Sequence, residues 1–166
     1  MSLSELADHI ERTHHAYLRV ELSRLGKLVE TAASVDGDKD PRVLGVRDTF
    51  RALAAVLSSH MMKEEQILFP MVRQLDTSDE APMFHCGTLA NPIHQMEFEH
   101  DQVGSTFTRL RELTDGFTAP EWASEDYRVL LDALADIEHD THAHTQKESE
   151  VLFPRAIEME QRKGTS

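Results

Sequence analysis

Four stretches of the sequence carry apolar side chains at alternating steps of three and four residues, and this spacing limits the fold more strongly than any other feature. Such steps place side chains on one face of an α-helix. The stretches are separated by segments 34–40, 76–90 and 115–120, which collect Asp, Gly, Ser, Thr and Pro. Four amphipathic helices predict an all-α protein, an up-down-up-down four-helix bundle. The length of 166 residues suits one domain, and we expect residues 1–166 to form it.

Each helical stripe is mainly apolar, but every stripe contains a histidine and two of them also contain a glutamate. In chain order the stripes are His15, Leu18, Leu22, Leu25 and Val29; Val43, Val46, Phe50, Leu53, Leu57, His60, Glu64 and Ile67; Ile93, Met96, His100, Val103, Phe107 and Leu110; and Tyr127, Leu130, Leu134, Ile137, Thr141, His144, Glu148 and Val151. No Lys or Arg lies on any of them. Burying two carboxylates without a cationic partner costs several kcal/mol each, so the stripes predict a bound cation in the core.

Two segments repeat one pattern, His60-Met-Met-Lys-Glu-Glu-Gln-Ile-Leu-Phe-Pro and His144-Thr-Gln-Lys-Glu-Ser-Glu-Val-Leu-Phe-Pro. Each places a histidine and a glutamate one turn apart on the same helical face. We expect each repeat to give one imidazole to a metal ion and one carboxylate as a bridge to a second ion. The alternative interpretation is a pair of polar layers that set helix register. Each Phe-Pro step predicts that its helix kinks or ends there.

The first and third helices complete the predicted site. Their histidines lie about ten residues after the helix starts, and antiparallel packing brings all four histidines to one level. The predicted metal ligands are His15, His60, Glu64, His100, His144 and Glu148. This set favours iron, because zinc prefers fewer ligands and calcium or magnesium prefers oxygen. We expect two iron ions joined by an oxo or hydroxo bridge, with manganese or zinc less favoured. A small diatomic or peroxide ligand should occupy an open coordination position.

Other histidines and the single cysteine fit the site less well. His94 lies near the start of the third helix, off its stripe by about 120°, and is a candidate ligand or gate residue beside the ordinary alternative of a surface histidine. His14 is offset from His15 by about 100°, which predicts a place beside the site or at the surface. Cys86 is the only cysteine, so no internal disulfide can form.

The net charge of −13 argues against nucleic acid and anionic membrane surfaces as partners, because both require a basic face. The sequence begins without a basic segment followed by an apolar one, and no apolar run approaches the length of a membrane span. We therefore expect a soluble cytoplasmic protein that binds neither a membrane nor nucleic acid. The oligomeric state is not predicted by these patterns.

The pattern of His15, His60-x-x-x-Glu64, His100 and His144-x-x-x-Glu148 resembles the haemerythrin-like (HHE) cation-binding domain. Segments 58–70, 91–101 and 152–156 resemble more closely the repair-of-iron-centres family, di-iron proteins linked to nitrosative and oxidative damage of iron-sulfur clusters. The resemblance implies that all six residues are ligands and that the two glutamates are the bridges.

The sequence departs from that family at three points. Where the family often has a further histidine ligand in a Val-His-Gly-x-x-His-Pro segment, this chain has Asp36 in the segment 35–41, which makes Asp36 a candidate oxygen ligand. The family's small N-terminal domain with paired cysteines is missing from this sequence. Met96 stands where haemerythrin usually has a second histidine, which makes a reversible dioxygen carrier less expected.

The resemblance implies a non-haem di-iron protein that binds or reduces nitric oxide, dioxygen or peroxide. It further implies a role in iron-sulfur cluster repair or stress response, with iron-sulfur proteins as partners. One alternative is a haemerythrin-like oxygen or iron sensor, or an iron store, without turnover. A third, weaker alternative is a structural bundle that pairs with another protein.

Overall fold

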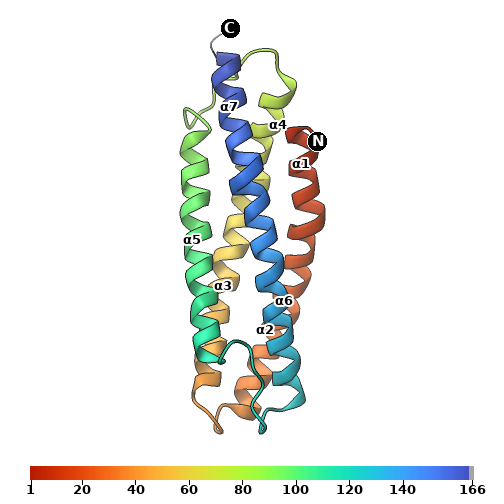
Figure 1. Cartoon of the computed structure of the whole chain (residues 1–166), viewed down its shortest axis with the longest axis vertical. Helices are drawn as coiled ribbons and strands as arrows, with labels where there is room; N and C mark the ends of the chain where they lie inside the picture. The colour runs from red at the N-terminus through yellow and green to blue at the C-terminus, as the bar shows by residue number, and fades with distance from the viewer. Residues whose placement is uncertain (165–166) are drawn as a thin grey trace.

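Four helical rods run antiparallel along the long axis of the molecule, as the computed structural model of residues 1–164 shows (Figure 1). Three rods each contain a short π-helical turn, labelled η. The rods are α1 (Leu3–Ile10), η1 (Glu11–His15) and α2 (Ala16–Asp36); α3 (Arg42–Lys63), η2 (Glu64–Leu68) and α4 (Phe69–Thr77); α5 (Ala90–Leu113); and α6 (Glu125–Lys147), η3 (Glu148–Leu152) and α7 (Phe153–Gly164). The prediction of an all-α, up-down-up-down four-helix bundle is confirmed. Residues 165 and 166 of the predicted domain lie outside the described residues.

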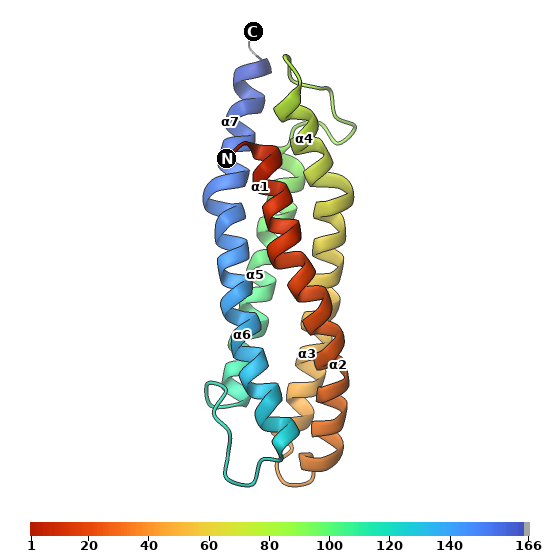
Figure 2. The same cartoon turned by 90° about the vertical axis from the view of Figure 1, so that its right-hand side faces the viewer.

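Local sequence explains where two of the rods begin. Ser2 forms a capping box with Glu5, because its hydroxyl accepts the Glu5 N–H while the Glu5 carboxylate accepts the Ser2 N–H. Ser124 caps α6 by accepting the N–H of Tyr127. Both ends of the described chain lie at the same end of the bundle, and the view turned by 90° shows α1 packed beside α4 (Figure 2).

The π-helical turns change which residues face the core. Each turn is closed by a backbone hydrogen bond over five residues, such as the one that the N–H of Phe69 donates to the carbonyl of Glu64. One extra residue per turn rotates the following face by about 100°. Leu68 is therefore buried, whereas Ile67, which the stripe placed in the core, is 53% exposed. The stripe also placed Val151 in the core, and this prediction is wrong because η3 shifts the helical face in the same way.

The same turns accommodate the two prolines. Proline lacks an N–H, and its ring collides with the carbonyl four residues earlier in an ordinary α-helix. Here Pro70 is the second residue of α4, which begins directly after η2, and Pro154 is the second residue of α7, which begins directly after η3. The helical backbone continues past both residues. Each helix was predicted to kink or end at its Phe-Pro step; neither helix ends there, and a change of hydrogen-bond register precedes each proline.

Two apolar clusters fill the two halves of the bundle and leave a polar layer between them. The larger cluster contains residues from Leu18 to Met61 and from Val103 to Ile137. The smaller one contains residues from the outer segments α1, α4 and α7, together with the start of α5. The histidines and glutamates of the stripes lie between these clusters in each rod. Among residues 1–164, no helix is both long enough and apolar enough to span a bilayer.

Candidate metal centre

The structure brings all six predicted ligands together in the polar layer. Their side chains come from η1, the ends of α3 and α6, the starts of η2 and η3, and the middle of α5. Five of these side chains are at most 1% exposed, and that of His100 is 8% exposed. Their ligand atoms form two groups, in each of which all atoms lie within 4.8 Å of one another.

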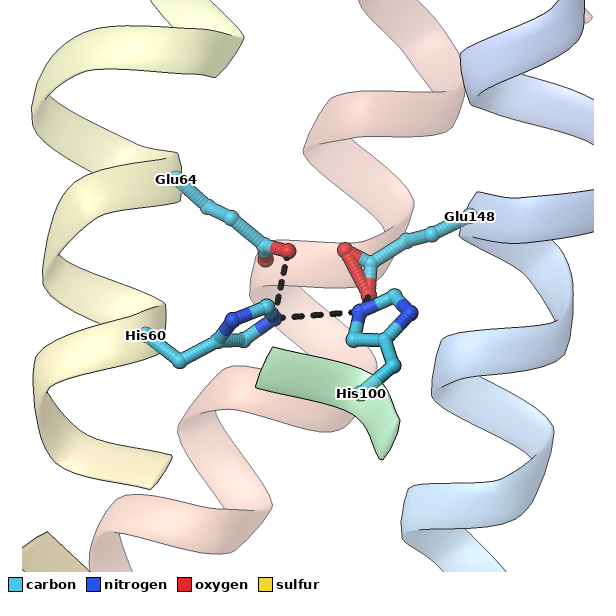
Figure 3. A group of neighbouring side chains, drawn as sticks. All are labelled: His60, Glu64, His100 and Glu148. Atoms are coloured by element: carbon cyan, nitrogen blue, oxygen red, sulfur yellow. Dashed lines mark hydrogen bonds and ion pairs between the residues drawn. The ribbon is translucent and has the colours of Figure 1, made fainter. Parts of the chain in front are cut away.

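The first group contains His60, Glu64, His100 and Glu148 (Figure 3). The side chains enter from three rods and point toward one another. The Nε2 atom of His60 lies 2.7 Å from Oε1 of Glu64 and 3.2 Å from Nε2 of His100. Nε2 of His100 lies 3.5 Å from Oε1 of Glu148. Two imidazoles and two carboxylates therefore surround one point.

The second group contains His15, Glu64 and His144. Nε2 of His15 lies 3.0 Å from Oε2 of Glu64 and 3.1 Å from Nε2 of His144. Nε2 of His144 lies 2.8 Å from Oε1 of Glu148, so that glutamate also approaches this group. Glu64 thus directs one carboxylate oxygen toward each group.

The polar atoms of this layer fit a cation better than they fit one another. Both oxygens of Glu64 and both oxygens of Glu148 are buried, and none accepts a hydrogen bond of acceptable geometry. The imidazoles approach in pairs through the same type of atom, Nε2, which requires a proton on one ring of each pair. Buried carboxylates without hydrogen bonds cost free energy, whereas cations held between the Nε2 and carboxylate atoms would satisfy them. The histidine and glutamate clusters therefore fit a metal site.

The charges of the layer shift several pKa values when no cation is present. Burial alone would lower the pKa of His60, but the charge of Glu64 outweighs it and raises the pKa to about 9. Burial also opposes protonation of His144, whose pKa nevertheless rises to about 10 because of Glu148. Burial favours the neutral form of Glu64, yet the nearby His60 holds its pKa well below the usual value. The metal-free layer therefore holds protons where a cation would bind.

A second carboxylate orients His60 from outside the layer. Oε1 of Glu99 lies 2.9 Å from Nδ1 of His60, while Oε2 accepts hydrogen bonds from Lys63 and Gln95. This contact fixes the ring with Nε2 directed at the cluster, as carboxylates do for metal-bound histidines. Glu99 was not among the residues predicted to belong to the site. Its position three residues after Met96, on the same helical face, was the signal that could have found it.

The other side of the layer carries a basic network. His14 is buried and its ring stacks on His144 at 5.3 Å between centroids. The ammonium of Lys147 donates to Nε2 of His14 and to Nε2 of His9, at 2.8 and 2.9 Å. Nδ1 of His14 therefore carries the proton that it donates to Asp140. His14 lies beside the site, one of the two places predicted for it.

The Leu-Phe-Pro end of each repeat supports a histidine of another rod. Phe69 stacks on His15 at 5.8 Å, and Phe153 stacks on His100 at 5.9 Å. The π-helical turns bring these rings inward, because each ring follows directly after a turn. The two repeats therefore contribute both candidate ligands and the apolar walls that hold the remaining imidazoles.

Two candidate ligands lie outside both groups. Asp36 stands 21 positions after His15 on one helical rod, which corresponds to roughly 30 Å. Its carboxylate accepts hydrogen bonds from the N–H and the hydroxyl of Ser124 and from Lys39. Asp36 is therefore not a ligand of the layer. It joins the end of α2 to the start of α6. His94 is exposed at the surface of α5 and does not enter the layer.

The role of Asp36 can be tested by substitution. We expect Asp36→Ala to lower the free energy of unfolding by about 1–3 kcal/mol, because it leaves the cap of α6 without its buried acceptor. Thermal or urea unfolding of the metal-free protein measures this change. The metal content should stay at the value of the unsubstituted protein. A loss of metal without a loss of stability would contradict the structural role.

A four-helix bundle whose buried histidines and glutamates converge in this way belongs to the class of cation-binding helical bundles. The model of the Hemerythrin HHE cation binding domain matches residues 6–156, and the chain belongs to that family.

Several curated proteins are similar to this chain. A probable iron-sulfur cluster repair protein of Haemophilus influenzae is 33% identical over 156 residues, which cover 94% of this chain. The iron-sulfur cluster repair proteins YtfE of Escherichia coli O157:H7 and Dickeya chrysanthemi are each 34% identical, over 93% and 94% of it. The chain spans 66% of the length of each of these relatives, so about one third of each lies outside the matched region.

Proposed function

We propose that this chain is a non-haem di-iron protein that binds or reduces a small oxidant, such as nitric oxide, dioxygen or peroxide. Its role would lie in iron-sulfur cluster repair or in the response to nitrosative and oxidative stress, with iron-sulfur proteins as its targets. The similarity to iron-sulfur cluster repair proteins supports that role. The observation that carries the proposal is the carboxylate of Glu64, whose two oxygens face two separate groups of imidazoles.

The proposed ligands of the first ion are His60 and His100, and those of the second ion are His15 and His144. Glu64 and Glu148 would bridge the two ions, because each carboxylate lies close to imidazoles of both groups. A set of four imidazoles and two carboxylates suits iron. We also propose that the described chain forms one haemerythrin-like domain, because its two apolar clusters and the layer between them belong to one bundle.

Bound iron ions would supply electrons and open coordination positions for the oxidant. The residues of the chain perform the remaining tasks. Glu99 holds the Nδ1 side of His60, and Ser149 lies 3.1 Å from Nδ1 of His100 and donates its own proton to Glu97. The apolar clusters above and below the layer keep bulk water away from its two ends. Imidazoles held by such contacts favour a defined ligand geometry.

Metal analysis and a visible spectrum test the proposal. We expect the protein purified without added metal to hold about two iron ions per chain, since the donors form two groups. Mixing the ferrous protein with nitric oxide in the absence of dioxygen should produce new absorption bands. The matched control is His94→Gln, which changes an exposed histidine outside the site and should alter neither result. Protein without iron, or ferrous protein whose spectrum nitric oxide leaves unchanged, would refute the proposal.

Dioxygen distinguishes turnover from simple binding. If the ferrous protein consumes dioxygen or nitric oxide and releases a product, the activity is reductive. Bands that appear with dioxygen and disappear when it is removed, with no product, would instead identify an oxygen sensor or carrier. Product analysis by gas chromatography for the nitrogen oxides, together with an oxygen electrode, separates these outcomes.

A further inference from the structure

The bundle is open along one side, between α5 and α6. Close backbone packing joins α3 to α5, α2 to α3 and α2 to α6, but no comparable packing joins α5 to α6. A cavity of about 600 Å³ lies along this open side, and its walls come from these two helices alone. Cavities of this size accommodate small-molecule ligands.

One end of the cavity reaches the candidate metal centre. His100 lines that end, and it is the candidate ligand with the greatest side-chain exposure, 8%. The other five candidate ligands are at most 1% exposed. A molecule from solvent can therefore approach the centre along α5 more easily than through the rest of the layer.

A buried hydroxyl without a partner lines the same cavity. Thr141 lies one turn before His144 and is 3% exposed, and its Oγ1 atom has no hydrogen bond. Helical threonines ordinarily bond a carbonyl of the preceding turn, as Thr106, Thr108 and Thr114 do in α5 or directly after it. An unsatisfied buried hydroxyl costs about 1–3 kcal/mol. The Thr141 hydroxyl is therefore available to donate a hydrogen bond to a ligand.

Small residues keep the cavity open. Gly104 lines the cavity and lies in the interior of α5. A glycine there makes the folded protein about 0.5–1 kcal/mol less stable than an alanine would. A Cβ atom at this position would meet nothing within 4 Å, so packing does not require the glycine. Ala135 of α6 also lines the cavity. The side chains of Val103 and Phe107, on α5 like Gly104, also line the cavity and are almost fully buried.

We propose that the α5–α6 cavity binds the exogenous ligand of the metal centre. Its ligand is a small hydrogen-bond acceptor with an oxygen or nitrogen end, and the Thr141 hydroxyl donates to it while Gly104 leaves its path clear. This inference rests on the proposed function, because the ligand binds at the ions held by the layer.

Access is tested in the metal-free protein, so that the result does not depend on the ions. Gly104→Leu and Ala135→Leu each place an isobutyl group in the cavity. We expect both to slow modification of His100 by diethyl pyrocarbonate several-fold, as measured by mass spectrometry. The exposed His94 of the same helix serves as the internal reference. Gly26→Leu is the matched control, because Gly26 is also a helical glycine with nothing within 4 Å of its Cβ position, but it lies in α2.

The hydrogen bond is tested in the metal-loaded protein with azide as the probe. Thr141→Val keeps the size of the side chain and should weaken azide binding about tenfold, the factor that corresponds to one hydrogen bond. Thr141→Ser restores a hydroxyl and should restore most of the affinity. Azide titrations followed by visible absorption give both values.

The outcomes separate this proposal from the proposed function. Protein that binds no metal overturns the proposed function, whatever the rate of His100 modification. Protein that loads two ions but whose His100 reacts equally fast with and without the leucine substitutions overturns the cavity as the entry path. Equal azide affinities of the Thr141→Val variant and the unsubstituted protein overturn the role of the hydroxyl.

Discussion

Replacing either bridging candidate, by Glu64→Gln or Glu148→Gln, is expected to remove most of the stability that bound metal gives to the protein. A ligand present at a thousand times its dissociation constant stabilises the folded state by about 4 kcal/mol. For a chain of this size, that corresponds to a rise in Tm of roughly 8–16 °C. We expect the metal-loaded variants to lose most of this rise. Calorimetry with and without metal, together with metal analysis, measures the effect.

The metal-free forms of these variants show how much of the lost stability comes from metal binding. Without metal, Glu64 faces the protonated His60 and Glu148 faces the protonated His144, so the change to glutamine removes this charge contact and lowers the free energy of unfolding of the metal-free protein as well. The loss in the metal-loaded protein should be larger, because it also includes the contribution of the bound metal. The matched control is Glu150→Gln, which makes the same chemical change at an exposed position of the same π-helical turn as Glu148. Its metal content and Tm should stay unchanged. Equal losses with and without metal would indicate a purely structural layer.

Metal binding near neutral pH is expected to release at least two protons, one each from His60 and His144. The pKa values of about 9 for His60 and about 10 for His144 mean that both rings are protonated in the metal-free protein at neutral pH. Metal ligation requires neutral imidazoles, so both protons must leave. A pH indicator in weakly buffered solution measures the release. His94→Gln is the control and should release the same number.

The same pKa values fix how the stability of the metal-free protein depends on pH. Both pKa values are raised above the ordinary histidine value of about 6.5, so the stabilisation is complete below that pH. It is lost as the pH rises through about 9 and then about 10. Urea unfolding across this range should therefore give a falling free energy of unfolding. A stability that rises over the same range, or a metal titration without proton release, would contradict the assignment.

Helix periodicity predicted the bundle and also predicted that the six candidate ligands lie in one layer. This succeeded because each of them lies on the core face of a helix, and the depth of a residue along antiparallel helices follows from its distance to the helix end. Asp36 shows the limit of family resemblance. Its position in the sequence suggested a ligand, but α2 carries it far from the layer, where it accepts hydrogen bonds from Ser124, the N-cap residue of α6.

The π-helical turns account for the errors in the predicted core. A stripe assumes a constant rotation per residue, and one inserted residue breaks that assumption. Ile67 and Val151 therefore face outward, whereas Leu68 and Leu152 face inward. The backbone hydrogen bond that defines such a turn has no strong signature in residue type, apart from the proline that follows η2 and η3.

The sequence by itself determined the kinds of side chain that enter the core and the helical face on which each of them lies, because both follow from spacing along one helix. Only the tertiary structure decided which atoms meet across helices. Glu99 behind His60, Lys147 between two imidazoles, and the unpartnered hydroxyl of Thr141 beside an open cavity depend on how the rods pack. Contacts of this kind join residues far apart in the chain, and helix periodicity carries no information about the neighbour that a side chain will meet.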